Sequence, residues 1–126
     1  MGQAETDSTG RLVANIDPRL LDFLETNIDS FVKWDLIRFF HDNPHTTDTA
    51  RNIAIYAGRH GETIRQDLDQ LAENGVLQSD KLRDMTVFSL SSDPEIRELL
   101  KEFVEASADR HFRIKAIYHI IRGIPR

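Results

Sequence analysis

The sequence predicts a mostly α-helical protein with one small β-hairpin. Two short helical patterns meet at Gly58 within residues 49–77, and two β-prone segments follow them up to Leu90. Asp-Pro pairs at positions 17–18 and 93–94 mark the starts of further helices, because Asp favours the N-cap and Pro the first helical turn. We therefore expect a central pair of helices and a hairpin, with additional N- and C-terminal helices on either side.

Length and composition favour a single soluble domain. The chain has 126 residues, of which 40% are hydrophobic and 29% charged, as in an ordinary globular domain. It contains no cysteine, which excludes disulfides and thiolate metal sites. No apolar run approaches the roughly 20 residues of a membrane span. We expect residues 1–16 to be disordered, residues 17–126 to form one domain, and the protein to be cytoplasmic, with no membrane partner.

The first two elements expected in the chain are helices. One covers residues 18–28 and has leucines at helical spacing after its Asp-Pro start. The other begins near Ser30 and ends at His41. This second helix is apolar on two faces, because Trp34 and Ile37 lie nearly opposite its main apolar stripe. It therefore needs cover on both sides, either from the terminal helices of the same chain or from a second copy.

Residues 49–77 combine two short helices with a tight turn between them. Thr49 can cap the first helix, and Gly58 supplies the left-handed residue that ends it. Asn74 and Gly75 end the second helix. The apolar stripe of this second helix, at spacing i, i+4, i+7 and i+8, consists of Ile64, Leu68, Leu71 and Ala72.

Two β-prone segments follow these helices. Residues 76–79 and 85–90 are rich in β-formers, and residues 80–84 connect them. The arrangement predicts a hairpin. Its connection carries Lys81 and Arg83 between two aspartates.

The central stretch resembles the winged helix-turn-helix of transcriptional regulators, broadly the MarR and ArsR type. Ile53-Ala54 and Ala57-Gly58 stand where that family's second helix has Leu-Ala and Gly, and Thr63-Ile64, Leu68, Leu71 and residues 74–77 match its third helix. The similarity covers roughly residues 31–91. It implies a winged-helix core there, with the hairpin as the wing, and a regulator that binds duplex DNA. Winged helices also serve as protein-binding modules, so the resemblance indicates the fold more firmly than the function.

A long helical pattern closes the chain over residues 94–122. As one helix it would be roughly 43 Å long, so a break at residues 107–111, where the stripe weakens, is the alternative. Apolar residues off the main stripe in its second half suggest a partner chain. We expect a homodimer built from the terminal helices. The residues expected at its interface are Trp34, Ile37, Phe112, Ala116 and Ile120.

The outer face of the second central helix bears on DNA binding. The residues directly opposite its core stripe are Glu62, Gln66, Asp69 and Glu73, and carboxylates oppose contact with phosphates. Arg65 has Glu62 and Asp69 as helical partners, so a surface ion pair is the alternative to base contact. The expected DNA contacts are Arg59, His60, Thr63, Arg65, Gln66, Lys81 and Arg83. The alternative function is a protein–protein interaction module whose acidic helix contacts a basic protein partner.

Neither a metal site nor an enzymatic site is expected. His41 and His45 are separated by a proline and share no helical face. His111 and His119 lie in residues 110–126, which carry five basic side chains and no acidic one, an unfavourable setting for a metal cation. The chain has no cysteine nucleophile, G-x-S-x-G motif, P-loop or Gly-rich dinucleotide turn. We therefore expect no cofactor and no catalysis.

Overall fold

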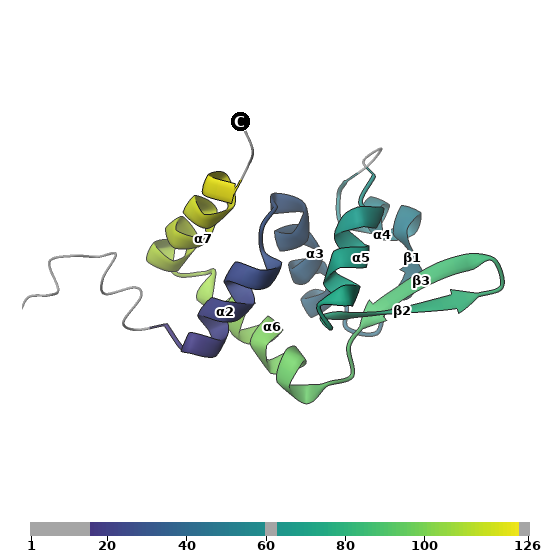
Figure 1. Ribbon diagram of the computed structural model, residues 1–126, viewed down its shortest axis with the longest axis horizontal. Coiled ribbons are helices and arrows are strands. Elements are labelled where there is room, and N and C mark those ends of the chain that lie inside the picture. The colour runs from purple at the N-terminus through teal and green to yellow at the C-terminus, as the bar shows by residue number, and fades with distance from the viewer. Residues whose placement is uncertain (1–15, 60–62, 124–126) are drawn as a thin grey trace, which may run out of the picture.

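The computed structural model describes residues 16–59 and 63–123, which form six helices and a three-stranded antiparallel sheet (Figure 1). The helices are α2 (Pro18–Asn27), α3 (Phe31–Asp42), α4 (Ala50–Tyr56), α5 (Arg65–Glu73), α6 (Pro94–Ala106) and α7 (Arg110–Gly123), and the strands are β1 (Thr47–Thr49), β2 (Leu77–Leu82) and β3 (Met85–Leu90). A mostly helical fold with a small β-hairpin is thus confirmed. The disorder expected for residues 1–16 falls almost entirely outside the described residues. No helix in the described ranges has the length and apolar character needed to cross a membrane.

Four helices, α2, α3, α4 and α6, begin at the capping residues that the sequence predicts. Asp17 and Asp93 each accept a hydrogen bond from the backbone N–H two residues on, at 2.8 and 3.0 Å, and so cap α2 and α6. Ser30 and Thr49 cap α3 and α4 by accepting from the N–H three residues on. A glycine with positive φ, 78° and 83°, follows α4 and α5 respectively. This conformation is one that other residues adopt at a cost, so the two turns depend on glycine.

The sheet has the order β1-β3-β2. β2 and β3 form the expected hairpin, and the pairing of Leu82 with Met85 leaves a two-residue turn. β2 is longer than expected, because residues 80–82 belong to the strand rather than to the connection. β1 was not expected: it is three polar residues long, too short to show a sequence period. Its position is set by pairing with β3, with Thr47 opposite Ser89.

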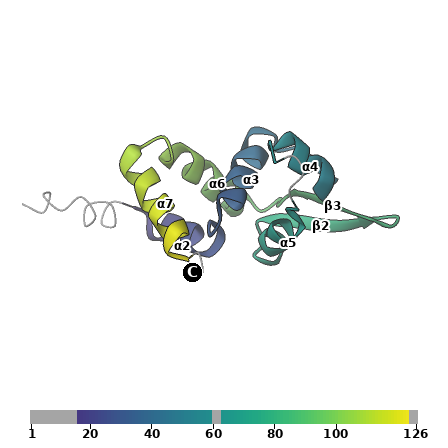
Figure 2. The same ribbon diagram turned by 90° about the horizontal axis from the view of Figure 1, so that it is seen from above.

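Helix α3 lies at the centre of the molecule, with α2, α6 and α7 on one side and α4, α5 and the sheet on the other (Figure 2). Leu36, Ile37 and Phe40 are at most 1% exposed. Trp34 packs edge-on against Phe103 of α6, with ring centroids 5.6 Å apart. Both apolar faces of α3 are therefore covered by helices of the same chain.

The long helix expected over residues 94–122 is divided into α6 and α7, so the alternative of a break is confirmed. Asp109 caps α7 by accepting a hydrogen bond from the backbone N–H of Phe112 at 3.0 Å. Arg113 donates to two backbone carbonyls just beyond α6, each at 3.1 Å. Carbonyl groups at the end of a helix have no N–H donor within the helix, so this side chain supplies one. The break lets Phe112 pack against Phe103, with ring centroids 5.8 Å apart.

Candidate nucleic-acid interface

Helix α5 and the β2–β3 hairpin lie side by side at one end of the molecule, and the hairpin extends beyond the helices (Figure 1). Gln66 and Glu73 are exposed on α5, and Thr63 is exposed just before it. Lys81 and Arg83 are exposed near the tip of the hairpin. We call this area the α5–hairpin surface. It contains most of the residues expected to contact DNA.

One flank of α5 is held against the junction of α2 and α3 by three polar pairs. The pairs are Asn74 donating to Asn27 at 3.0 Å, Ser30 donating to Asp67 at 3.3 Å, and Lys33 donating to Gln70. Lys33 has a side chain only 3% exposed and also pairs with Asp29 at 2.8 Å. The contacts fix the orientation of α5, and they turn Asp67 and Gln70 toward the fold rather than toward a partner.

The other flank of α5 faces β3 through Arg65. Its guanidinium Nε donates to both carboxylate oxygens of Asp69, at 3.1 and 3.2 Å, and its Nη2 donates to Thr86 at 3.5 Å. The guanidinium carbon also lies 5.5 Å from the centre of the Phe88 ring. The surface ion pair, weighed against base contact for Arg65, is therefore the arrangement observed. A phosphate or base that approached Arg65 would meet a guanidinium already paired with Asp69.

Arg59, expected to contact DNA, is bound to α3 in this structure. Its Nε and Nη2 both donate to one carboxylate oxygen of Asp35, at 2.9 and 2.6 Å, and the Arg59 side chain is only 23% exposed. This charge-assisted pair ties the turn after α4 to α3. The structure thus gives Arg59 a structural contact with α3, and the DNA contact expected from the sequence stays a prediction. His60 lies outside the described residues.

The charges that remain available on the α5–hairpin surface are of both signs. Lys81 and Arg83 make no hydrogen bond or ion pair with the described residues. Asp80 and Asp84 are exposed beside them, and Glu73 is exposed on α5. The surface therefore has no strong net field, and the hairpin provides its accessible cations.

Asp48, at the junction of β1 and α4, has a pKa below the ordinary aspartate value. Burial raises this pKa, but hydrogen bonds to the carboxylate outweigh the effect. Asn52 donates at 2.8 Å, the backbone N–H of Thr49 donates at 2.7 Å, and Tyr56 donates as well. The ionised carboxylate thus holds the start of α4 to the sheet.

The residues expected at a dimer interface lie inside the fold. Their exposed fractions are 8% for Trp34, 1% for Ile37, 4% for Phe112 and 0% for Ala116 and Ile120. Because the chain's own helices already cover these side chains, they do not form a surface for a second copy. The exposed face of α7 carries Ile114, Tyr118 and Ile121, which are 52%, 59% and 54% exposed. Both faces of α7 are apolar, so its sequence period did not distinguish the covered face from the exposed one.

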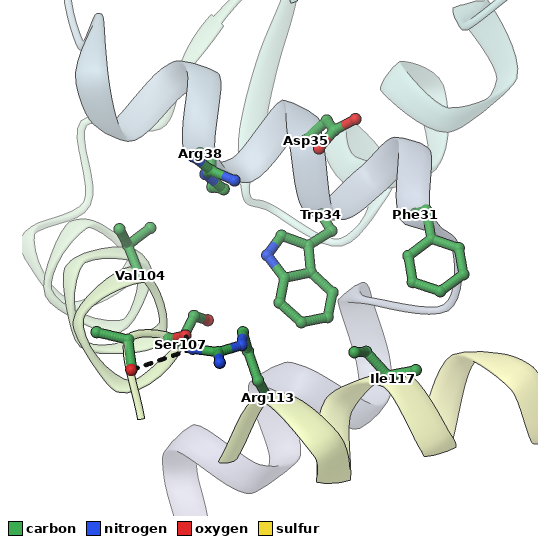
Figure 3. A pocket seen from close by; sticks show the side chains of 9 residues that line it. Phe31, Trp34, Asp35, Arg38, Val104, Ser107, Arg113 and Ile117 are labelled. Carbon is green, nitrogen blue, oxygen red and sulfur yellow. Dashed lines mark hydrogen bonds between the residues drawn. The ribbon is translucent and has the colours of Figure 1, made fainter. Parts of the chain in front are cut away.

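A groove of about 450 Å³ lies between α3 and the α6–α7 pair, and the sequence did not predict it (Figure 3). Its lining residues are Phe31, Trp34, Asp35, Arg38, Val104, Ser107, Ala108, Arg113 and Ile117. The lining comes from two segments about 70 positions apart, so no local pattern reveals it. It includes no residue of α5 or the hairpin.

Within the described ranges, no three His, Asp or Glu side chains come close enough together to hold a metal ion. Comparison with family models, with curated proteins and with solved structures gives no match for this chain.

Proposed function

We propose that this chain is a winged-helix DNA-binding regulator, with α5 placed in the major groove and the hairpin on the neighbouring backbone. The observation that carries the proposal is an exposed hairpin with two cations that make no ion pair with the described residues, Lys81 and Arg83, beside the outer face of α5. Lys and Arg neutralise phosphates, and the major groove admits an α-helix. The order α3-β1-α4-α5-β2-β3 supports the proposal, because the sequence resemblance implies a winged helix over this stretch.

Affinity is expected to be modest and to depend on the hairpin. Arg59 and Arg65 are compensated by Asp35 and Asp69, so few cations are available for phosphates. With about two phosphate contacts, the logarithm of the binding constant should fall with the logarithm of salt concentration at a slope of roughly −2. Exposed Glu73 opposes binding.

Fluorescence anisotropy of a labelled random duplex, at about 50 and about 200 mM salt, tests the proposal. Replacing Lys81 and Arg83 together by Ala should weaken binding and flatten its salt dependence. Replacing Asp69 and Glu73 together by Gln should tighten non-specific binding, because it removes repulsion and releases Arg65. The absence of any DNA binding by the parent at the lower salt concentration would refute the proposal.

A matched control removes two exposed cations from the other side of α3. The double variant Lys101→Ala and Arg110→Ala, on α6 and α7, loses the same net charge as the hairpin variant (Figure 2). It should bind DNA nearly as the parent does. If it loses as much affinity as the hairpin variant, binding reflects overall charge and not the α5–hairpin surface.

The second candidate function is a protein–protein interaction module. The observation that favours it is that Arg59 and Arg65 are each bound to a carboxylate of the same chain. Gln66 and Glu73 are then the exposed groups of α5 that have no hydrogen bond or ion pair with the described side chains. A basic partner would then need Asp69 and Glu73, and Lys81 and Arg83 would be dispensable. Titrating the Lys81/Arg83 and Asp69/Glu73 double variants with a lysine-rich helical peptide separates the two candidate functions. The protein-interaction function predicts that the Asp69/Glu73 variant loses peptide binding, whereas the DNA-binding function predicts that the Lys81/Arg83 variant loses DNA binding.

We also propose that the protein forms a homodimer through the exposed face of α7. Ile114, Tyr118 and Ile121 share this face, and their spacing is nearly symmetric about Tyr118. Two antiparallel copies would therefore place Ile114 of one against Ile121 of the other, as a two-fold interface requires. The charged residues of α7 are all cationic: Arg110, Arg113, Lys115 and Arg122. Repulsion between the two helices should make this dimer stronger as salt increases.

A further inference from the structure

The end of the β2–β3 hairpin carries two exposed apolar side chains. Leu82 and Met85 are 56% and 45% exposed, and they lie directly opposite each other on either side of the two-residue turn. Directly opposite side chains share one face of a sheet, with Cβ atoms roughly 5 Å apart. Neither side chain belongs to the hydrophobic core or packs against it. The two form one apolar projection, which we call the tip pair.

The tip pair lies beyond the part of the hairpin that the rest of the fold supports. Among the described residues, β1 pairs with β3 over residues 87–89, so the hairpin has only two strands from there to its turn. This end of the hairpin extends past the helices (Figure 1). A two-stranded ribbon is marginally stable in water, and exposed apolar groups add no stability to it. Only a partner molecule can bury the tip pair.

The cations beside the tip pair favour DNA as that partner. Lys81 and Arg83 stand on either side of Leu82 in the sequence, and both are exposed without a hydrogen bond or ion pair to the described residues. Cations next to an apolar group suit the minor groove, where phosphates border the exposed edges of the bases. A helix in the major groove has a minor groove across the adjacent backbone, and β2 lies beside α5.

The aspartates at the tip limit what phosphate contacts alone can contribute. Asp80 and Asp84 are exposed next to Lys81 and Arg83, so the formal charges of these four residues cancel. The tip pair offers a contribution of another kind. Burial of apolar surface releases no counterions, so its contribution to affinity depends little on salt concentration.

We propose that the hairpin inserts Leu82 and Met85 from the minor groove between two base pairs and thereby bends the DNA. Leu and Met are among the side chains that act as such wedges in minor-groove proteins, which kink the duplex by about 20–90°. Insertion costs least at flexible pyrimidine–purine steps such as TA, so these steps are the preferred sites. The inference rests on the proposed DNA binding and adds a bending activity to it.

Two duplexes of about 25 base pairs, identical except for one tandem T·T mismatch, test the wedge. The parent should bind the mismatched duplex about tenfold more tightly, because bases at a mismatch are already poorly stacked. Energy transfer between dyes on the two DNA ends should rise on binding, since bending shortens their separation. Equal affinities with unchanged energy transfer would overturn the wedge and leave DNA binding in place. Failure to bind either duplex would overturn the proposed function as well.

A double variant locates the activity. Leu82→Thr with Met85→Thr removes the tip pair and keeps a residue type that favours strands. It should lose both the preference for the mismatched duplex and the rise in energy transfer. Its salt dependence should match that of the parent, because Lys81 and Arg83 still reach phosphates on a folded hairpin. The exchange variant Leu82→Met with Met85→Leu keeps both apolar side chains and should behave as the parent does. A mismatch preference that survives in the Thr variant would refute the wedge.

A matched control removes an exposed apolar side chain from another element. Ile55→Thr changes a residue that is 45% exposed on α4, outside the hairpin, and should bend DNA as the parent does. An equal loss of bending in this variant would show that the effect does not belong to the tip pair. Titration with a lysine-rich helical peptide tests a protein partner. If the Thr double variant loses peptide binding but keeps the parent's behaviour toward DNA, the tip pair contacts a protein and the wedge is refuted.

Discussion

At the scale of single residues, Lys33 is a cation placed inside the fold. Its ammonium joins Asp29 at 2.8 Å to Gln70 on α5, and the side chain is 3% exposed. A buried charge is tolerated only with such partners, so Lys33 couples the start of α3 to the position of α5.

Two substitutions of Lys33 should therefore lower the free energy of unfolding by different amounts. Lys33→Met keeps most of the apolar stem and loses the donors, with an expected loss of about 1–2 kcal/mol in the free energy of unfolding. Lys33→Ala also leaves a cavity and should lose about 2–4 kcal/mol. Urea unfolding measures both. The exposed control Lys101→Met should stay within about 0.5 kcal/mol of the parent, and an equally small change in Lys33→Ala would contradict the assigned role.

Asp48 gives a prediction about pH. Its pKa is lower in the folded state than the ordinary value of about 3.9, because Asn52, Thr49 and Tyr56 bond the ionised form. A lowered folded-state pKa contributes stability that is present above the unfolded pKa and is lost as pH falls through the folded pKa. Asp48→Asn should thus be less stable than the parent at neutral pH, and the difference should shrink below about pH 4. Urea unfolding across this pH range measures it, and a difference independent of pH would contradict the prediction.

At the scale of secondary-structure elements, the hairpin turn contains a strained residue. Arg83 has a φ of 62°, a left-handed conformation that costs a non-glycine residue about 1 kcal/mol. Its side chain is exposed and makes no contact that explains the choice of arginine structurally. The proposed contact with phosphate gives a functional reason for a cation at this point.

Two substitutions at Arg83 separate conformation from charge. Arg83→Gly and Arg83→Ala remove the same cation, but only glycine relieves the left-handed backbone. Arg83→Gly should be more stable than Arg83→Ala by about 1 kcal/mol in thermal or urea unfolding. Both should lose the same DNA affinity, and unequal losses would mean that hairpin geometry, and not the charge, determines binding.

At the scale of the whole molecule, the exposed face of α7 predicts the oligomeric state. Sedimentation at tens of micromolar should show a dimer that strengthens between about 0.05 and about 0.5 M salt, because salt screens the cations of the two α7 helices. Tyr118→Lys adds a cation at the centre of the face and should give a monomer. Ile55→Lys, at a 45% exposed position on α4, is the matched control and should remain dimeric. A monomeric parent at the higher salt concentration would refute this interface.

Much of the fold was predictable from the sequence because its signals are local. The Asp-Pro starts of α2 and α6 act through hydrogen bonds spanning two residues, and Gly58 acts through its own φ. Three of the four residues in the predicted core stripe of α5 are buried: Ile64, Leu68 and Leu71 are at most 1% exposed, and Ala72 is partly buried against the core. Helical spacing alone places these three side chains on one side of the axis.

Only the tertiary structure decided which side chains are buried and which ion pairs form where the sequence allowed two outcomes. Periodicity shows that α7 has two apolar faces, but only packing against the rest of the chain determines that Phe112 is covered and Tyr118 exposed. Ion-pair partners likewise depend on distance in space, so Arg59 binds Asp35, 24 positions earlier in the chain. The groove beside Trp34 exists only where α3 meets α6 and α7. The sequence determined the elements because their energies are local, whereas the surfaces they leave for partners depend on long-range packing.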